Sequence, residues 1–266
     1  MRIVCLSAEA ADICHRLGAW EQVVGVSAFA RVPGPSKPVV SGFSSGNLAR
    51  VLSLAPDLVI TFSDVQAQLA HDLIRAGCQV LALNCHSLEG VVRSIHLLGG
   101  VLGRAEAAER LARWFGHELT RLQFRPTRRP RVYFEEWDDP PIAGIGWVRE
   151  VVRLAGGDPL PLGAGFKAKD RICSTEEVLR HDPEVILLSW CGKPANAAAV
   201  QARPGWADCA AVRGGWICSV DPNKILQAGP ALVEGLVAIR HVVSAWCAHH
   251  REPRHPPQVQ PIQPSI

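Results

Sequence analysis

The strongest chemical signal in the sequence is a run of four carboxylates around one indole, Glu135-Glu136-Trp137-Asp138-Asp139. Burying unpaired carboxylates is costly, so such a cluster is either solvated or has partners. In a functional reading the carboxylates bind a cation or accept hydrogen bonds from ligand amides, and Trp137 provides a stacking surface. In a structural reading they form a solvated loop before Pro140-Pro141. We favour function, because a tryptophan between carboxylates is unusual for a plain loop.

A second candidate anchor is Trp190, which is followed closely by Cys191 and Lys193. Aromatic faces bury a large area at a small entropic cost, and ligand clefts are mostly apolar walls with a few placed polar groups. The aromatic residues that could join Trp190 in such a wall are Trp137, Trp147, Trp206 and Phe62. The alternative is that these rings are core or interface residues, and it is the stronger reading for Trp147 and Trp206. For Arg203, in an Arg203-Pro204-Gly205-Trp206 run, we expect a structural role in which it pairs with a carboxylate.

Signals for catalysis or for a protein-bound metal are weak. Cys191 near Lys193 resembles an activated thiol, and Cys85 is followed directly by His86, but neighbours in a strand point to opposite faces and so do not form a dyad. The sequence contains no GxSxG, phosphate-loop GxxxxGK[ST] or complete GxGxxG motif, and no CxxC or HxxxH spacing. We therefore expect no catalytic residues and no metal ligands.

The elements that must position these residues are βα units, because short apolar runs alternate with helix-length amphipathic segments. We expect strands at residues 2–6, 23–27, 58–62, 80–84, 131–134, 185–189 and 216–220. We expect helices at residues 9–17, 47–53, 64–76, 88–102, 147–154, 174–180 and 229–248. Residues 105–124 show helical spacing of Leu111, Trp114, Leu119 and Leu122, which predicts one long helix between two halves.

The second half of the chain partly repeats the first. Residues 51–60 match residues 178–187. Both runs predict a helix that ends at a proline followed by an acidic residue, and then a buried strand. The sequence thus predicts an α/β fold: two Rossmann-like lobes with parallel sheets, joined by one long backbone helix, with the ligand cleft between the lobes. We expect an N-terminal lobe at 1–103, the helix at 104–126, a C-terminal lobe at 127–250 and a disordered proline-rich tail at 251–266.

Ligands of open α/β sheets bind outside the carboxyl ends of the strands, and this rule selects the candidate ligand-binding residues. In the N-terminal lobe these are Glu9, Phe43, Phe62, Ser63 and Asp64. In the C-terminal lobe they are Glu135, Glu136, Trp137, Asp138, Trp147, Trp190, Cys191, Lys193, Lys224 and Gln227.

Composition narrows the classes of partner. The net charge of +3 is too small to indicate nucleic acid or an anionic membrane surface, and no apolar run is long enough for a membrane span. The nine cysteines are an odd number, and several lie in apolar strand-like runs. The chain also opens directly on a strand-like run. From these features we expect a reduced, cytoplasmic protein without an export signal.

Three features of the chain resemble substrate-binding proteins of the helical-backbone class, which serve vitamin B12, haem and siderophore importers. They are the opening run RIVCLSAEAADI, the run LAPDLVI at 54–60, and the helix between the lobes. The most similar branch is that of the vitamin B12-binding proteins, and the resemblance covers about residues 1–247. It implies a ligand held in the cleft by a binding protein that is not an enzyme. The glutamates that face the transporter in this family are not evident at 64–68 or 194–199, so we expect docking to an ABC permease to be doubtful.

Together these observations predict a non-catalytic protein that holds a cobalamin-like corrinoid between its lobes for intracellular handling. His71 and His86 are the nearest candidates for a protein ligand to the cobalt. One alternative is another chelate, haem or a siderophore, bound as the receptor of an ABC importer, although the single tyrosine, Tyr133, argues against a siderophore. Another is a small-molecule enzyme on the same scaffold that uses Glu135, Glu136 or Cys191. A third is an exported component whose start lies upstream of Met1.

Overall fold

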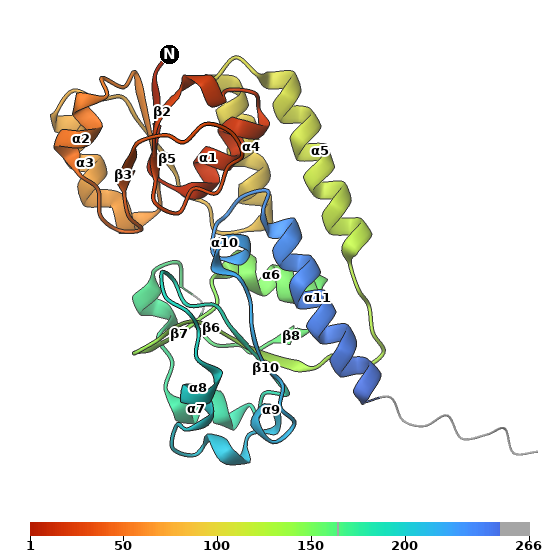
Figure 1. Cartoon of the computed structure of the whole chain (residues 1–266). Helices are drawn as coiled ribbons and strands as arrows, with labels where there is room; N and C mark the ends of the chain where they lie inside the picture. The colour runs from red at the N-terminus through yellow and green to blue at the C-terminus, as the bar shows by residue number, and fades with distance from the viewer. Residues whose placement is uncertain (164, 251–266) are drawn as a thin grey trace, which may run out of the picture.

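The structure is a computed structural model, and it describes residues 1–163 and 165–250. Two α/β lobes lie one above the other in Figure 1, and long helices run along one side of them. The expected fold class is therefore confirmed. The predicted tail at 251–266 lies outside the described residues.

The first lobe is built on five parallel strands in the order β3-β2-β1-β4-β5. Parallel sheets are buried on both faces, which explains why β1 and β4 are almost continuously apolar. The strands are β1 Ile3–Cys5, β2 Val23–Ser27, β3 Val39–Ser41, β4 Leu58–Phe62 and β5 Val80–Leu83. The helices are α1 Ala8–Arg16, α2 Leu48–Ser53, α3 Ala67–Arg75 and α4 Leu88–Val101, with short 3-10 turns at Trp20–Gln22 and Asp64–Gln66. The sequence did not predict β3, because three residues are too few to show a period.

The second lobe has a mixed sheet in the order β10-β9-β6-β7, with β8 also paired to β6. Only β7 runs antiparallel. The strands are β6 Arg131–Asp138, β7 Pro141–Ala143, β8 Asp158–Pro159, β9 Val185–Leu188 and β10 Ile217–Ser219. The helices are α6 Gly146–Leu154, α7 Thr175–Arg180, α8 Ala197–Gln201, α9 Ala210–Arg213 and α10 Pro222–Ile225, with 3-10 turns at Ala168–Arg171 and Trp206–Asp208. The expected end of β6 at Phe134 is wrong, since the strand continues to Asp138.

An arginine anchors the central strand of the first lobe. Arg2 donates from Nε to the carbonyl oxygen of Leu54 (2.9 Å), and its backbone N–H donates to the Asp57 carboxylate (2.6 Å). Between these partners Ala55 has φ of 44°, a left-handed conformation that a non-glycine residue rarely adopts. The strained turn and the arginine together fix where α2 ends and β4 begins.

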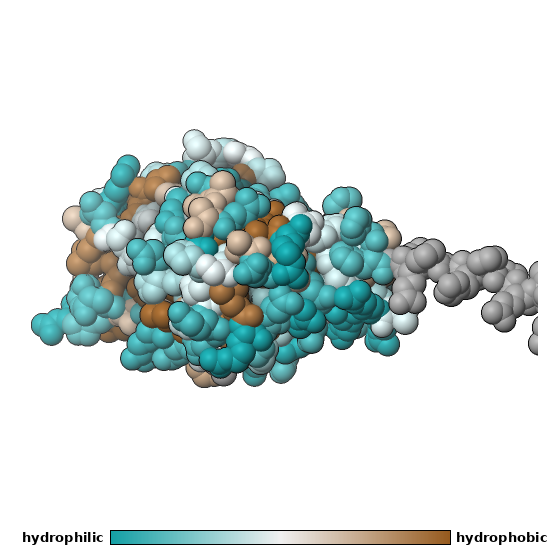
Figure 2. Space-filling view, turned by 90° about the horizontal axis from the view of Figure 1, so that it is seen from below, coloured by the Kyte–Doolittle hydropathy of each residue, from teal (hydrophilic) through white to brown (hydrophobic). Residues whose placement is uncertain are grey.

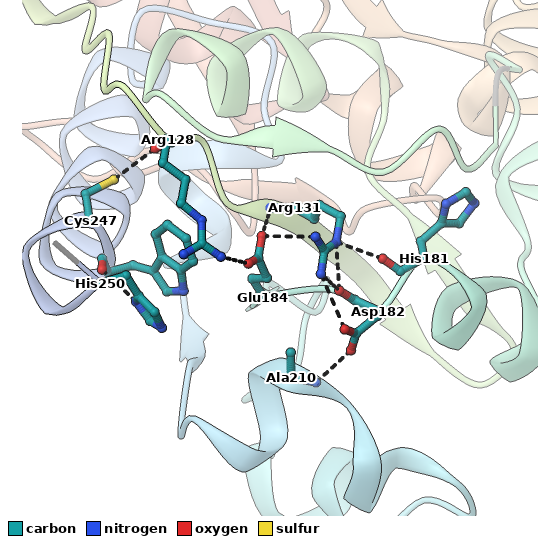
Figure 3. A network of polar contacts seen from close by, with 9 residues as sticks. Arg128, Arg131, His181, Asp182, Glu184, Ala210, Cys247 and His250 are labelled. Carbon is teal, nitrogen blue, oxygen red and sulfur yellow. Dashed lines mark hydrogen bonds and ion pairs between the residues drawn. The ribbon is translucent and has the colours of Figure 1, made fainter. Parts of the chain in front are cut away.

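The same arrangement recurs in the second lobe, where Figure 3 shows it. Arg131 donates from Nε to the His181 carbonyl oxygen (3.0 Å), and its backbone N–H donates to the Glu184 carboxylate (3.1 Å). Asp182 occupies the position of Ala55, with φ of 40°. The repeat in the sequence therefore corresponds to one structural unit used twice.

The long helix α5 Ala105–Leu122 connects the two lobes, and a second long helix, α11 Leu232–His249, follows the last strand of the second lobe. The α5 helix packs against α4 of the first lobe and against α11, which in turn packs against α6 of the second lobe. Buried residues of both lobes and of both helices form one hydrophobic cluster, with members such as Ile95, Phe115, Val151 and Leu236. The lobes therefore share a core on one side and remain separate on the other.

At the edge of this shared core the two lobes touch at two points, each of which involves a backbone group of α4 or of the residues before it. The Leu88 N–H of α4 donates to the Glu150 carboxylate of α6 (2.7 Å). A Cβ atom added at Gly146 would lie 2.3 Å from the carbonyl oxygen of His86, so only glycine fits at the first residue of α6. This contact sets how closely the lobes approach at the base of the cleft.

One face of the molecule is mainly polar. Figure 2 shows a largely hydrophilic face, with hydrophobic side chains gathered mostly toward the left of the view. Across the part of the chain that the structure describes, none of the helices has the length and apolarity needed to cross a bilayer.

The close contact at Gly146 gives a first prediction. Gly146→Ala should lower the free energy of unfolding by about 1–3 kcal/mol, because the new methyl group collides with the His86 backbone. Gly100→Ala is the matched control: it lies on α4 with open space around its Cβ position, and there alanine should stabilise by about 0.5–1 kcal/mol. Urea unfolding measures both, and an equal gain in stability for the two variants would contradict the assigned lobe contact.

Candidate functional site

Two adjoining cavities lie between the lobes at the carboxyl ends of the strands. One, the apolar cavity, has a volume of about 390 Å³, and the other, the polar cavity, about 690 Å³. Both fall in the range of small-molecule sites. Five residues line both cavities: Phe29, Phe43, Cys191, Gly192 and Leu226. The two cavities are thus halves of one cleft.

Aromatic rings from both lobes surround the apolar cavity. Phe43 of the first lobe packs edge-on against Phe62 at 5.4 Å and against Phe29 at 6.3 Å between ring centroids. The second lobe contributes Trp137 and Phe166. These rings provide faces on which a flat ligand can stack.

Phe29, Phe43 and Phe62 form one side of the apolar cavity, which we call the phenylalanine wall. The buried amide of Gln66 holds two of these residues in place. Its Nε2 donates to the carbonyl oxygens of Leu6 (2.9 Å) and Phe43 (3.2 Å), and its Oε1 accepts from the Phe62 N–H (3.2 Å). Ser63 turns the chain away from β4 with φ of 38°, and Asp64 follows it at the cavity wall. The strand-end rule thus placed Phe43, Phe62, Ser63 and Asp64 at the cleft.

Glu136 lines the apolar cavity but is already paired. Its carboxylate accepts from the Ile145 N–H (2.7 Å) and from Nη1 of Arg171 (2.5 Å), and Arg171 also donates to the Ala143 carbonyl oxygen. Burial raises the pKa of Glu136, and the Arg171 guanidinium opposes that rise. The pair closes the cavity wall and leaves little carboxylate free for a cation.

Glu135 faces the opposite side of β6 and lines neither cavity. It is fully buried, accepts two hydrogen bonds from Arg203 (2.6 and 2.9 Å), and also accepts from Tyr133 Oη and Trp190 Nε1 (3.0 and 3.1 Å). Charge-assisted bidentate bonds of this kind are strong. Glu135 therefore orients Trp190 instead of meeting a ligand, and Arg203 has the carboxylate partner that the sequence predicted.

Lys193 sits on the rim between two indoles. Its ammonium lies 4.2 Å from the Trp137 ring centre and 5.1 Å from that of Trp190, and pairs with Asp138 at 2.5 Å. Cation–π contacts hold the long side chain in one place. Trp190 and Lys193 line the polar cavity, whereas Asp138 lies behind them.

The remaining predicted residues lie at varying distances from the cleft. Trp147 reaches the apolar cavity but is nearly buried, with Nε1 donating to the Ile225 carbonyl oxygen (2.9 Å), and Trp206 is a core residue. Gln227 lines the polar cavity, while Lys224 pairs with Glu234 (3.0 Å) and lines neither. Glu9 is buried beside a separate cavity of about 20 Å³ below the phenylalanine wall, enough for one water.

The potential nucleophile and metal ligands are poorly suited to chemistry. Burial raises the pKa of the Cys191 thiol to about 11, so it is protonated near neutral pH. His86 lines the apolar cavity and stacks on Phe166 at 4.4 Å, but its buried Nδ1 lacks the hydrogen-bond acceptor that usually orients a metal-ligating histidine. His71 is an exposed residue of α3, outside both cavities. No group of three or more potential metal ligands occurs within 1–163 and 165–250.

Sequence reasoning missed several cleft residues, among them Arg31, Phe29, Phe166 and Arg171. Phe29 lies just beyond the end of β2 at Ser27, so the strand-end rule could have found it. Phe166 and Arg171 come from the irregular segment between β8 and α7, which has no period to indicate which way its side chains point.

Comparison with known proteins identifies the family. Residues 3–223 match the family described as periplasmic binding protein. The chain belongs to this family. It is thus a ligand-binding protein of the periplasmic type, and the fold and the resemblance expected from the sequence are confirmed.

Individual relatives support this assignment. The uncharacterized ABC transporter substrate-binding lipoprotein YvrC of Bacillus subtilis is 27% identical over 252 residues, covering 88% of this chain and 77% of its own. The vitamin B12-binding protein of Vibrio campbellii is 27% identical over 195 residues, 71% of this chain and 70% of its own. The periplasmic haem-binding protein RhuT of Roseiflexus sp. RS-1 superimposes with a TM-score of 0.75 at 25% identity, covering 92% and 98% of the two chains.

The expected cytoplasmic location is wrong. The matched family is described as periplasmic, and the relative in Bacillus subtilis is named as a substrate-binding lipoprotein. The cysteines misled the prediction because Cys5, Cys14, Cys85, Cys173 and Cys209 are buried as small hydrophobic residues, so they report on packing and not on the redox compartment. The expectation that docking to an ABC permease is doubtful also loses its support, since the relative in Bacillus subtilis is named as an ABC transporter component.

The buried pair of Glu135 and Arg203 gives a prediction on stability. Arg203→Met should lower the free energy of unfolding by about 3 kcal/mol, because it leaves a buried carboxylate without its charge partner. Lys224→Met, which breaks the exposed pair with Glu234, is the control and should cost less than about 1 kcal/mol. Urea unfolding followed by tryptophan fluorescence measures both. Similar small losses would show that Glu135 does not depend on Arg203.

Glu9 predicts a pH dependence of stability. Burial raises the pKa of this carboxyl, so the folded protein binds its proton more readily than the unfolded chain. The associated stability is present below the unfolded pKa and is lost as the pH rises through the raised pKa. Glu9→Gln should therefore raise the free energy of unfolding near neutral pH and change it little near about pH 4. Urea unfolding at both pH values tests this, with the exposed Glu106→Gln as control, and an unchanged stability at neutral pH would contradict it.

Proposed function

We propose that this protein is the substrate-binding receptor of an ABC importer outside the cytoplasm, and that it carries a cobalamin-like corrinoid without catalysing a reaction. The observation that carries the proposal is the convergence of phenylalanine and tryptophan rings from both lobes on one apolar cavity. Such walls suit a broad macrocycle with apolar faces and polar edges. The vitamin B12-binding relative in Vibrio campbellii supports this choice of ligand.

The groups at the cleft edge fit the amides of a corrinoid. Lys193 and Gln227 are donors at the rim, and Asp64 is a potential acceptor. Because Glu136 and Arg171 neutralise each other, the cavity wall carries no unpaired charge from this pair. A ligand with many neutral amides needs this mixture of donors and acceptors.

Haem is the second candidate, and the structural similarity to RhuT favours it. His86 is the imidazole in the apolar cavity that could approach a haem iron. Among the described residues, His86 Nδ1 has no hydrogen-bond partner that would orient the ring as a metal ligand, which favours the corrinoid over haem.

The geometry gives no support to an enzyme that uses Glu135 or Cys191. Glu135 is buried against Arg203, and the Cys191 thiol has a pKa of about 11. A general base or a thiol nucleophile needs access to substrate and a pKa closer to the working pH.

Calorimetric titration with cyanocobalamin, hydroxocobalamin and hemin tests the proposal. Cobalamin should bind at 1:1, and Trp137→Ala should weaken it about tenfold or more, because a stacking surface is lost. Trp114→Ala is the control, since this partly exposed indole lies on α5, away from the cleft. Binding of hemin alone would favour the second candidate, and equal affinities for the two tryptophan variants would move the site away from this cavity.

A further inference from the structure

The two halves of the cleft differ in chemistry. Apart from the shared residues, the apolar cavity is walled mainly by rings and aliphatic side chains. The polar cavity adds a set of charged and hydrogen-bonding residues: Arg31, Lys193, Ser219, Asp221, Asn223 and Gln227. A ligand that fills the whole cleft therefore meets an apolar surface at one end and a polar one at the other.

The balance of charge in the polar cavity is cationic. Arg31 donates from Nη1 to the carbonyl oxygens of Ala28 (2.9 Å) and Ala30 (3.1 Å), which orient the guanidinium without neutralising it. Within residues 1–163 and 165–250 no carboxylate forms an ion pair with Arg31. An oriented guanidinium with free donors is well suited to a phosphate or carboxylate group.

The acidic residue of the polar cavity does not cancel this charge at the surface. The Asp221 carboxylate accepts from the N–H and the Nδ2 of Asn223, both at 2.9 Å, and so is turned to the start of α10. On the other side, Lys193 is held in place by Trp137, Trp190 and Asp138. Arg31 of the first lobe thus provides a cation without an ion-pair partner among the described residues, while Lys193 of the second lobe adds donors and shares its charge with Asp138.

We propose that the polar cavity binds the phosphodiester arm of a complete corrinoid while the corrin ring stacks in the apolar cavity. This inference rests on the proposed function and adds a specificity: the protein should prefer cobalamin to a corrinoid without the nucleotide arm. The phosphodiester carries a negative charge and lies at one end of the ligand, in keeping with a cationic region at one end of the cleft.

The experiment compares cyanocobalamin with dicyanocobinamide, which has the ring but no nucleotide arm, by calorimetry on the full chain. The wild-type protein should bind cobalamin about tenfold or more tightly than cobinamide. Arg31→Gln should weaken cobalamin binding by about tenfold and leave cobinamide binding unchanged. Arg75→Gln is the matched control, an exposed arginine at the end of α3, and should change neither affinity.

The outcomes separate this inference from the proposed function. Equal affinities for the two corrinoids, or an Arg31→Gln variant that weakens the binding of both equally, would overturn the proposal that the polar cavity binds the phosphodiester arm. Corrinoid binding itself would stand. No binding of either corrinoid by the folded protein would overturn the proposed function itself. Binding of hemin alone, weakened in Arg31→Gln, would assign the polar cavity to propionate carboxylates and overturn the corrinoid version. If Arg31→Gln disturbs the circular dichroism spectrum, the wild-type protein at raised ionic strength makes the same comparison: salt should weaken the binding of cobalamin more than that of cobinamide, and an equal effect on both would overturn the proposal.

Discussion

The cleft depends on the hydrophobic core that the two lobes share. Helices α4, α5, α6 and α11 bury apolar side chains from both lobes in one cluster, and the contact between Gly146 and His86 ends that cluster at the base of the cleft. Interiors packed in this way resist deformation. The distance between the phenylalanine wall and the side of the cleft formed by Trp137 and Trp190 is therefore set mainly by the fold, before any ligand binds.

The side chains of the walls are held by partners outside the cavities. Gln66 ties Phe43 and Phe62 to β1, and the pair of Glu135 and Arg203 holds Trp190 from behind. Pre-organised walls reduce the entropy lost when a ligand binds. The pair with Arg203 also occupies the Glu135 carboxylate, and Arg171 occupies that of Glu136.

Much of this arrangement could be predicted from the sequence, but not all of it. The repeated run of helix, acid and strand indicated two lobes, and the strand-end rule located Phe62, Asp64 and Gln227 at the cleft. The sequence did not show that β6 continues to Asp138, and strand alternation then sends Glu135 and Glu136 of the cluster at 135–139 to opposite faces. The partner Arg171 could not be predicted, since it approaches Glu136 from an irregular segment 35 residues away.

A crystal structure of the protein with cyanocobalamin tests the central claim most directly, because the anomalous signal of cobalt locates the ligand without interpretation of its shape. The account predicts one cobalt peak between Phe62 and Trp137, with the corrin plane against the phenylalanine wall. A cobalt peak outside the cleft, or an empty cleft at a large excess of ligand, would contradict it.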